Sequence, residues 1–422
     1  MARIRYIWNK GHQICLNLIF NTEVEDNKMD EKYFRKGFGL KDDIAGEIGR
    51  DYHSAIIDHI KSNGYEQSFG ETSILLAKEY GFCYGVDRSV EYAYQTVQKF
   101  PERRIYLTGE IIHNPYVNNR LIQMGVRFLS GPHHKGEKIA DIMPEDVVIL
   151  PAFGVSIPML TELREKNCIM VDTTCGSVLL VWKHVERFAK EGYTALVHGK
   201  YYHEETIATV SRSAEKFLIV LNENEAQKVC DYIRKPQNRA EFIEYFAQKM
   251  SPGFDPDRDL QKIGVANQTT MLAKESLKIG EMVKQALIDR YGAESLSEHF
   301  RAFDTICSAT QERQDAITEM LAKKPDLAIV IGGFNSSNTK SLTAIAQKYC
   351  SAYHIEDPDN LLDAQNITHL PVGTHGSVVT CDWLPSGRIT VAVTAGASTP
   401  DAKIGQVIKK IVMLRGEVIP SF

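Results

Sequence analysis

The chain has 422 residues, 43% of them hydrophobic and 24% charged, which is ordinary for a globular protein and enough for two or three compact units. A formal net charge of −5 gives no general attraction to nucleic acid or to anionic membranes. Eight cysteines are spread thinly along the sequence, which argues against a disulfide framework and indicates a reducing compartment. We therefore expect a cytoplasmic protein with free thiols.

Residues 1–71 are predicted to form an N-terminal extension that is partly helical around 51–62. Three basic residues precede a short apolar run near the start, but no small-residue cleavage site follows, so a signal peptide is disfavoured. Met29 opens a more regular segment, and we interpret residues 1–28 as a loose extension. No apolar run approaches the length that spans a bilayer.

After this extension, the chain repeats one unit three times. Each copy begins with a short apolar strand that ends at a cysteine, and a helical stretch follows Cys83, Cys175 and Cys307. About 25 residues after each cysteine, an apolar strand ends in glycine ("RIYLTG", "YTALVHG", "DLAIVIGG"), and a polar loop opens another helix. Two more strands complete each copy. Alternating strands and helices predict parallel sheets with right-handed crossovers.

The repeat predicts an α/β fold of three lobes related by a pseudo-threefold axis. Each lobe should hold a small parallel sheet with flanking helices, around a shared centre. Lobe 2 carries a polar, turn-rich insertion at about 234–262. The predicted boundaries are 72–174 for lobe 1, 175–306 for lobe 2, 307–399 for lobe 3, and 400–422 for a C-terminal helix and tail.

The cysteines of the repeat are candidate metal ligands. Ligand groups gather at the carboxyl ends of parallel strands, so three lobes around one axis bring Cys83, Cys175 and Cys307 to one point. Iron–sulfur clusters usually take four thiolates, and three would leave one iron open to substrate. A single such cysteine would be interpreted as buried and inert. A cysteine at the same position of all three repeats instead favours metal binding. Zinc is disfavoured because closely spaced Cys or His pairs are absent.

The polar loops beside these cysteines supply candidate substrate-binding groups. They carry His113, His203 and the stretches 267–270, 335–338 and 397–399. Helix N-termini with Ser, Thr and Asn suit a phosphate group, and protonated imidazoles add positive charge. Helix capping would explain the Ser and Asn residues about as well, but their equivalent positions in the repeats favour a site.

Two adjacent glutamates follow His203. Because Glu204 and Glu205 are neighbours, only one of them is expected to face the centre. A carboxyl in a closed site has a raised pKa and can pass protons to a substrate. The other would be a solvated carboxylate at the start of a helix.

Eight ordered motifs between about residues 72 and 415 resemble the LytB/IspH family of 4-hydroxy-3-methylbut-2-enyl diphosphate reductases, in the longer form typical of plants and cyanobacteria. They are "GFCYGVDRSV", "IIHNPYVNNRL", "VDTTCGSV", "HEETIAT", "NQTTML", "DTICSATQERQ", "NSSNTKSL" and "TAGASTPD". The resemblance implies reductive removal of the substrate's allylic hydroxyl, which yields isopentenyl and dimethylallyl diphosphate in the last step of the methylerythritol phosphate pathway.

The same resemblance implies the site residues. Cys83, Cys175 and Cys307 would bind a [4Fe-4S] cluster, and Glu205 would be the proton source. Many bacterial members have a histidine where this chain has Phe153, so a third imidazole for the diphosphate is absent. The implied substrate-binding residues are His113, His203, Thr269, Ser336, Ser337, Asn338 and Ser398.

The chain has no flavin motif and no second cysteine set, so we expect ferredoxin or flavodoxin as an external electron donor. Three alternatives stay open: a [4Fe-4S] hydro-lyase, a quinolinate-synthase-like enzyme and a non-catalytic iron–sulfur sensor. A quinolinate-synthase-like enzyme should have arginines for carboxylate substrates in its central loops, and a sensor has no need of Glu205. A radical S-adenosylmethionine enzyme is disfavoured because its compact three-cysteine motif is missing. The oligomeric state is left open.

Overall fold

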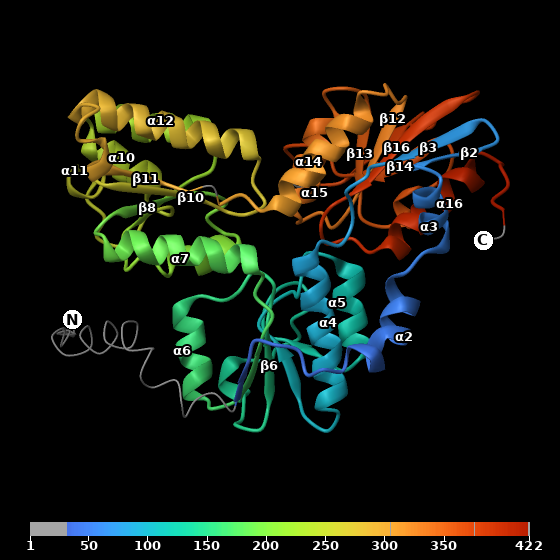
Figure 1. Ribbon diagram of the computed structural model, residues 1–422, viewed down its shortest axis with the longest axis horizontal. Coiled ribbons are helices and arrows are strands. Elements are labelled where there is room, and N and C mark those ends of the chain that lie inside the picture. Colours follow the sequence, from blue (N-terminus) through green and yellow to red (C-terminus); the bar gives the residue numbers. More distant parts are fainter. Residues whose placement is uncertain (1–31, 304, 375, 421–422) are drawn as a thin grey trace, which may run out of the picture.

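The structure is a computed structural model that describes residues 32–303, 305–374 and 376–420. The predicted loose extension 1–28 lies outside these residues, as does Asp304. The described chain forms three lobes, two at the top of Figure 1 and the third below them. Each lobe is built around one main sheet with flanking helices, so the predicted three-lobed α/β fold is confirmed.

The three main sheets share one strand order. In each sheet, the first strand of the repeat lies in the middle, between the second strand and the third. A fourth strand, which leads to one of the three cysteines, pairs with the third. All of these pairings are parallel, as a repeated strand–helix unit requires. The strands in sheet order are β5 (Arg127–Phe128), β4 (Ile105–Leu107), β6 (Val147–Leu150) and β7 (Ile169–Asp172) in lobe 1; β9 (Phe217–Val220), β8 (Thr194–His198), β10 (Ile263–Asn267) and β11 (Phe300–Ala302) in lobe 2; and β13 (Ser351–Ile355), β12 (Leu327–Ile331), β16 (Ile389–Ala395) and β3 (Thr72–Leu76) in lobe 3.

The fourth strand of lobe 3 comes from the N-terminal part of the chain. β3 pairs in parallel with β16, whereas the predicted boundaries place residue 72 at the start of lobe 1. By strand pairing, 72–76 therefore belong to lobe 3. The N-terminal extension adds two further strands: β1 (Tyr33–Phe34) is parallel to β7, and β2 (Glu66–Phe69) is antiparallel to β3.

Each cysteine of the repeat lies on a segment that leaves the sheet of one lobe and enters a helix of the next. The helix after Cys83 packs in the core of lobe 1, the one after Cys175 in lobe 2, and the one after Cys307 in lobe 3. The three crossings bring the cysteines to the junction of the lobes. These helices are α4 (Tyr84–Lys99), α7 (Gly176–Lys190) and α14 (Ser308–Leu321).

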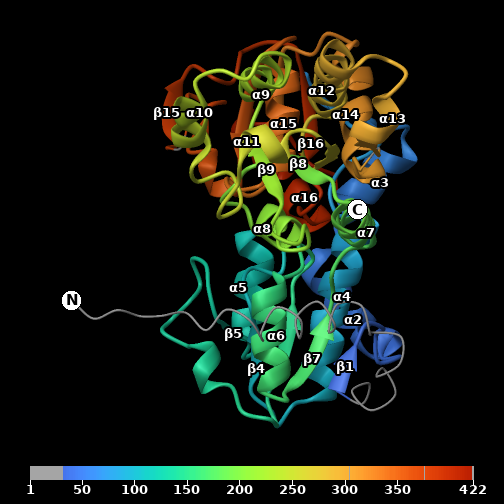
Figure 2. The same ribbon diagram turned by 90° about the vertical axis from the view of Figure 1, so that its left-hand side faces the viewer.

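Helices cover the sheets. In lobe 2, α12 (Ala273–Tyr291) and α7 lie above and below the sheet in Figure 1, and Figure 2 shows the same molecule from its left side. The remaining helices are α2 (Lys41–Tyr52), α3 (Ala55–Ser62), α5 (Pro115–Gln123), α6 (Ile157–Glu165), α8 (Glu204–Val210), α9 (Glu223–Arg234), α10 (Arg239–Phe246), α11 (Pro256–Asp259), α13 (Leu296–His299), α15 (Ser337–Ala346) and α16 (Asp401–Leu414), with two short 3-10 turns and the small hairpin β14 (Asn366–His369) and β15 (Val378–Cys381).

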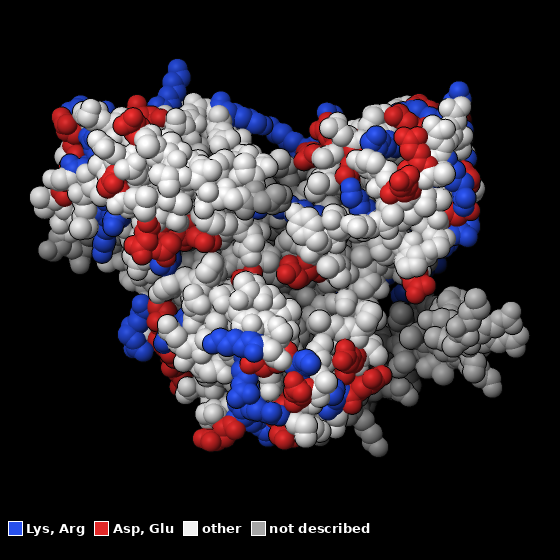
Figure 3. All heavy atoms as spheres, turned by 180° about the vertical axis from the view of Figure 1, so that it is seen from behind, with Lys and Arg blue, Asp and Glu red and all other residues white. Residues whose placement is uncertain are grey.

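Alternation along the strands divides the apolar cores. In lobe 1, Ile105 and Leu107 face one buried cluster, and Tyr106 between them faces another. In lobe 3, α3 and α16 pack together through side chains such as Ile57 and Ile408. No helix in the described ranges is long and apolar enough to cross a membrane. Figure 3 shows both charge signs interspersed on the back face and a hollow between the two upper lobes.

Candidate active site

The three cysteines of the repeat each stand directly before a helix. Cys83, Cys175 and Cys307 are the N-cap residues of α4, α7 and α14, and each has an extended backbone. All three thiols are free and half-buried. The first N–H groups and the dipole of a helix favour negative charge, so they act toward the thiolate, the form that binds metal, against the effect of burial.

Contacts across the lobes bring the thiols close to one another. A Cβ atom at Gly85 would lie only 2.4 Å from Cys175 Sγ, and Ser177 Oγ donates a hydrogen bond to Cys307 Sγ at 3.4 Å. Burial raises the pKa of both Cys83 and Cys175, and the Cys307 thiol adds to the rise in each. Three soft thiols near one another at the lobe junction, with a glycine where a side chain would intrude, fit the donor set of an iron–sulfur cluster.

Hydrogen bonds tie each cysteine turn to the loop that follows a third strand. The N–H groups of the first two cysteines donate to the carbonyls of Ala397, at 3.3 Å, and Ala152, at 3.0 Å. Two residues before the third cysteine, the Thr305 hydroxyl accepts from the Asn267 N–H at 3.1 Å and donates to the Asn267 side chain. The metal-ligand candidates and the candidate substrate-binding loops are therefore held together. These loops also carry Ser398, Phe153 and Thr269.

A chain of hydrogen bonds fixes the protons of the two histidines. The Glu205 N–H donates to His203 Nδ1 at 3.2 Å, so the neutral ring carries its proton on Nε2. That N–H points at His113 Nε2, 3.1 Å away, and His113 Nδ1 in turn donates to Glu110 Oε2 at 2.9 Å. Both rings are neutral in this arrangement. The His203 Nε2–H can donate to an anion that takes the place of its contact with His113.

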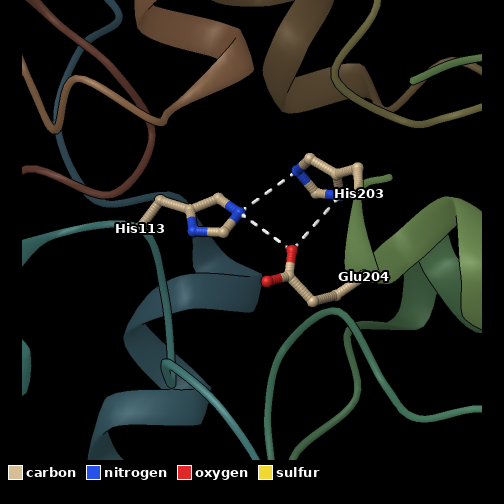
Figure 4. A group of neighbouring side chains, drawn as sticks. All are labelled: His113, His203 and Glu204. Carbon is tan, nitrogen blue, oxygen red and sulfur yellow. Dashed lines mark hydrogen bonds and ion pairs between the residues drawn. The ribbon is translucent and has the colours of Figure 1, made fainter. Parts of the chain in front are cut away.

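Glu204 lies beside the same two rings, as Figure 4 shows. Its Oε2 is 3.8 Å from His113 Nε2 and 3.9 Å from His203 Nδ1, and about half of its side chain is exposed. These three residues are close enough to hold a metal ion. However, His203 Nδ1 accepts a backbone N–H and leaves the proton on Nε2, so the neutral ring offers a metal no free lone pair. The group is better suited to an anion.

Glu205 is the buried member of the glutamate pair, with 1% of its surface exposed. Its Oε1 accepts from the Thr269 N–H at 2.6 Å, and its Oε2 accepts from the Thr269 hydroxyl at 3.0 Å. Burial raises the pKa of Glu205 to about 7, against the effect of these hydrogen bonds. Near neutral pH this carboxyl can hold a proton and release it.

The predicted Ser and Asn residues lie at the start of α15 and on the loop after β16. Ser336 caps α15 by accepting from the Thr339 N–H at 3.3 Å, which is the capping function considered from the sequence. Ser398 Oγ donates to the His113 carbonyl at 3.1 Å and so joins lobe 3 to lobe 1. Asn338 Nδ2 is buried without a hydrogen-bond partner, and Asn338 Oδ1 accepts from the Ala397 N–H. An unpaired buried donor in this position fits a ligand oxygen.

The family described as LytB protein matches residues 74–412 of this chain. The chain belongs to the LytB family. Two relatives are named 4-hydroxy-3-methylbut-2-enyl diphosphate reductase. The one from Gloeobacter violaceus is 46% identical over 391 residues, which are 92% of this chain and 93% of the relative. The one from Thermosynechococcus vestitus is 48% identical over 387 residues, 91% and 95% of the two chains.

A solved structure supports the fold assignment of this LytB family member. It is the E-1-hydroxy-2-methyl-but-2-enyl-4-diphosphate reductase from Plasmodium falciparum, with a TM-score of 0.58 and 24% identity. The similarity covers 80% of this chain and 87% of that one. The family resemblance drawn from the eight sequence motifs is confirmed by the family match and by the two relatives.

Three polar residues that sequence reasoning did not assign individually complete this LytB site. Glu110 accepts from His113 and, at 2.7 Å, from Asn335 Nδ2 of lobe 3. Lys200 Nζ donates to Ser337 Oγ at 2.7 Å, from lobe 2 to lobe 3. Glu110 precedes His113 by three residues, and Lys200 follows a glycine-ended strand, so both stood within stretches already of interest.

Phe153 packs against the histidines. Its ring stacks on that of His113, with 4.3 Å between centroids and 22° between planes, and meets His203 edge to face at 5.6 Å. Phe153 is thus an apolar ring that helps orient the two imidazoles.

The Glu110–His113 pair leads to a testable expectation. In Glu110→Gln, the acceptor for His113 Nδ1 remains but the negative charge that supports a protonated ring is lost. Affinity for an anionic substrate should fall by about 10-fold or more, because hydrogen bonds to charged groups contribute about 1.5–3 kcal/mol. Steady-state kinetics should show a raised KM with kcat nearly unchanged. An unaltered KM would contradict this assignment of Glu110.

Proposed function

We propose that the protein catalyses reductive dehydroxylation of (E)-4-hydroxy-3-methylbut-2-enyl diphosphate to isopentenyl and dimethylallyl diphosphate. The observation that carries this proposal is the buried, protonatable Glu205 at a lobe junction that also holds three free helix-capping thiols. The names of the relatives point to the same reaction. We further propose a cytoplasmic location, since every described cysteine is free.

The proposed cofactor is a [4Fe-4S] cluster on Cys83, Cys175 and Cys307. When bound, such a cluster supplies single electrons and an iron with an open coordination position for the substrate hydroxyl. The thiols suit this task because each caps a helix and none is tied into a disulfide. Ferredoxin or flavodoxin is the proposed external donor, as the chain has no second redox motif.

The residues around the cysteines bind and orient the substrate. His113 and His203 come from lobes 1 and 2, while Ser337, Asn338 and Ser398 come from lobe 3, so a diphosphate among them is held by all three lobes. The unpaired Nδ2 of Asn338 is a donor that awaits an acceptor, and the Nε2–H of His203 can exchange its bond to His113 for one to the diphosphate. Binding energy from this remote end fixes the reacting carbon in place.

Glu205 supplies the proton that the leaving hydroxyl needs. Hydroxide is a poor leaving group, and protonation lets it depart as water. Thr269 holds both oxygens of the Glu205 carboxyl, one through its N–H and one through its hydroxyl, which orients the acid before the substrate arrives. Burial raises the pKa of this carboxyl to about 7, so a share of the molecules carries this proton near neutral pH.

Anaerobic purification, cluster reconstitution and turnover with a reduced dye test the proposal. We expect a coloured protein with iron and sulfide that consumes the hydroxylated allylic diphosphate and releases both products. Colourless, iron-free protein under these conditions would overturn the cluster assignment. A loaded cluster with dehydration but no net electron uptake would favour the hydro-lyase, and a cluster without any turnover would favour a sensor.

The raised pKa of Glu205 predicts a pH profile. A carboxyl with a pKa of about 7 carries its proton below that pH and loses the proton as the pH rises through that value. At saturating substrate, kcat should therefore be flat below about pH 6 and fall about tenfold per pH unit above about pH 8. The measurement is kcat between pH 5.5 and 9.5 with a dye whose reduction is independent of pH. A kcat that rises across this range would exclude Glu205 as the acid.

A further inference from the structure

Lys200 is a half-buried lysine at the junction of lobes 2 and 3. It follows β8 and Gly199, and its backbone N–H donates to Gln268 Oε1 at 3.1 Å. Its ammonium crosses to lobe 3 and donates to Ser337 Oγ at 2.7 Å, on the first residue of α15. No carboxylate of the described residues lies within the 4.0 Å of an ion pair from Lys200 Nζ. A positive charge is thus held inside the site by a neutral hydroxyl.

Such a charge is costly unless a partner arrives. Burial lowers the pKa of Lys200 to about 8, and the charge of Lys340 acts in the same direction. Lys340 lies on the first turn of α15, and its ammonium likewise has no carboxylate at ion-pair distance among residues 32–303, 305–374 and 376–420. Two uncompensated ammonium groups near the same helix start indicate the place of an anion.

The anion would also meet the histidines. His203 has a pKa well below its ordinary value because it is buried, and the charges of His113 and Lys200 add to this effect. Lys200 is therefore near enough to His203 for their charges to interact. Phe153 stacks on His113, so that face of the imidazole is covered by an apolar ring.

We propose that Lys200 is a substrate-binding residue whose ammonium, together with the Ser337 hydroxyl, pairs with the diphosphate end of the substrate. It supplies, from lobe 2, positive charge that the Phe153 side cannot provide. This inference rests on the proposed function, because it takes the ligand of the site to be a diphosphate. Lys340 contributes through its field, at longer range.

Inorganic diphosphate is the probe for the first test. On the reconstituted protein, we expect Lys200→Met to raise the dissociation constant for inorganic diphosphate, measured by calorimetry, by about 10- to 100-fold. The KM for the allylic diphosphate should rise in parallel with a smaller change in kcat. Lys200→Arg keeps the charge and should recover most of the affinity. The control is Lys348→Met, which removes an exposed lysine just beyond the other end of α15.

Thermal stability separates binding from a structural function. Removing an unpaired, half-buried ammonium should leave the melting temperature of the free protein unchanged or raised. The added stability that diphosphate gives the wild type should shrink in Lys200→Met, since that stability follows the affinity. A lower melting temperature with an unaltered dissociation constant would overturn the proposal and make Lys200 a structural residue.

The outcomes for Lys200 and for the proposed function differ. If wild type and Lys200→Met bind inorganic diphosphate equally while the wild type turns over the allylic substrate, the Lys200 inference fails alone. If the cluster-loaded wild type neither binds inorganic diphosphate nor consumes the substrate, the proposed function fails, and the Lys200 inference fails with it. A loss of affinity in Lys200→Met only, with Lys348→Met unchanged, supports both.

Discussion

Glu205→Gln is expected to slow turnover by about 10²–10⁴-fold while leaving the iron and sulfide content of the reconstituted protein unchanged. Glutamine keeps the shape of the side chain and can still accept the Thr269 N–H, but its amide has no acidic proton to transfer. The amide also removes the cost of ionising a buried carboxyl, so the variant should fold at least as well as the wild type.

Glu244→Gln is a matched control, since it makes the same change at an exposed position of α10 in the same lobe. Its turnover should equal that of the wild type. Single-turnover reduction followed by product analysis would show whether the loss lies in the chemical step. Undiminished turnover in Glu205→Gln would remove Glu205 as the proton source and direct attention to the neighbouring Glu204.

Cys83→Ser, Cys175→Ser and Cys307→Ser should each lose the cluster and, with it, the activity. A lost metal ligand should weaken binding by at least the roughly 10- to 100-fold that changes in supporting residues cause. Iron and acid-labile sulfide analysis after anaerobic reconstitution measures this directly. Because the cluster binds only the folded chain, the increase in melting temperature on reconstitution should also disappear.

Cys381→Ser serves as the control, since that thiol is exposed on β15 and donates a hydrogen bond to Asn366 within its own hairpin. This variant should bind the cluster and turn over the substrate like the wild type. If Cys381→Ser lost as much iron and sulfide as the other three cysteine variants, the loss of the cluster would not be specific to the proposed ligands. Full loading of any of the three would exclude that cysteine as a ligand.

Local patterns explain why the sequence predicted much of this molecule. The apolar strands, the helices after each cysteine and the glycine-ended strands are short-range signals, and their threefold recurrence indicated three lobes. Cys83, Cys175 and Cys307 occupy the same position in each repeat, which predicted that these thiols lie near one another. Each is the N-cap residue of a helix, which explains why the position recurs.

These local patterns could not predict the contacts between lobes. The pairing of β3 with β16 joins segments that are more than 300 residues apart in the sequence. The residues of β3 do not by themselves indicate which strand they pair with. The bond from Lys200 to Ser337, likewise, joins two lobes. Periodicity and spacing describe neighbours along the chain, whereas the charge and proton state of this site depend on neighbours in space.

The pairing of β3 with β16 has a consequence for synthesis of the protein. A strand from the first fifth of the chain waits for its partner until residues 389–395 have been made. At a typical 5–20 residues per second, the delay is roughly 15–60 s. During that time the apolar segment 72–76 has an unpaired edge, the kind of surface that aggregates or recruits chaperones. Folding of lobe 3 thus closes a ring that begins near the N-terminus, and the site at its centre can be completed only after nearly the whole chain has left the ribosome.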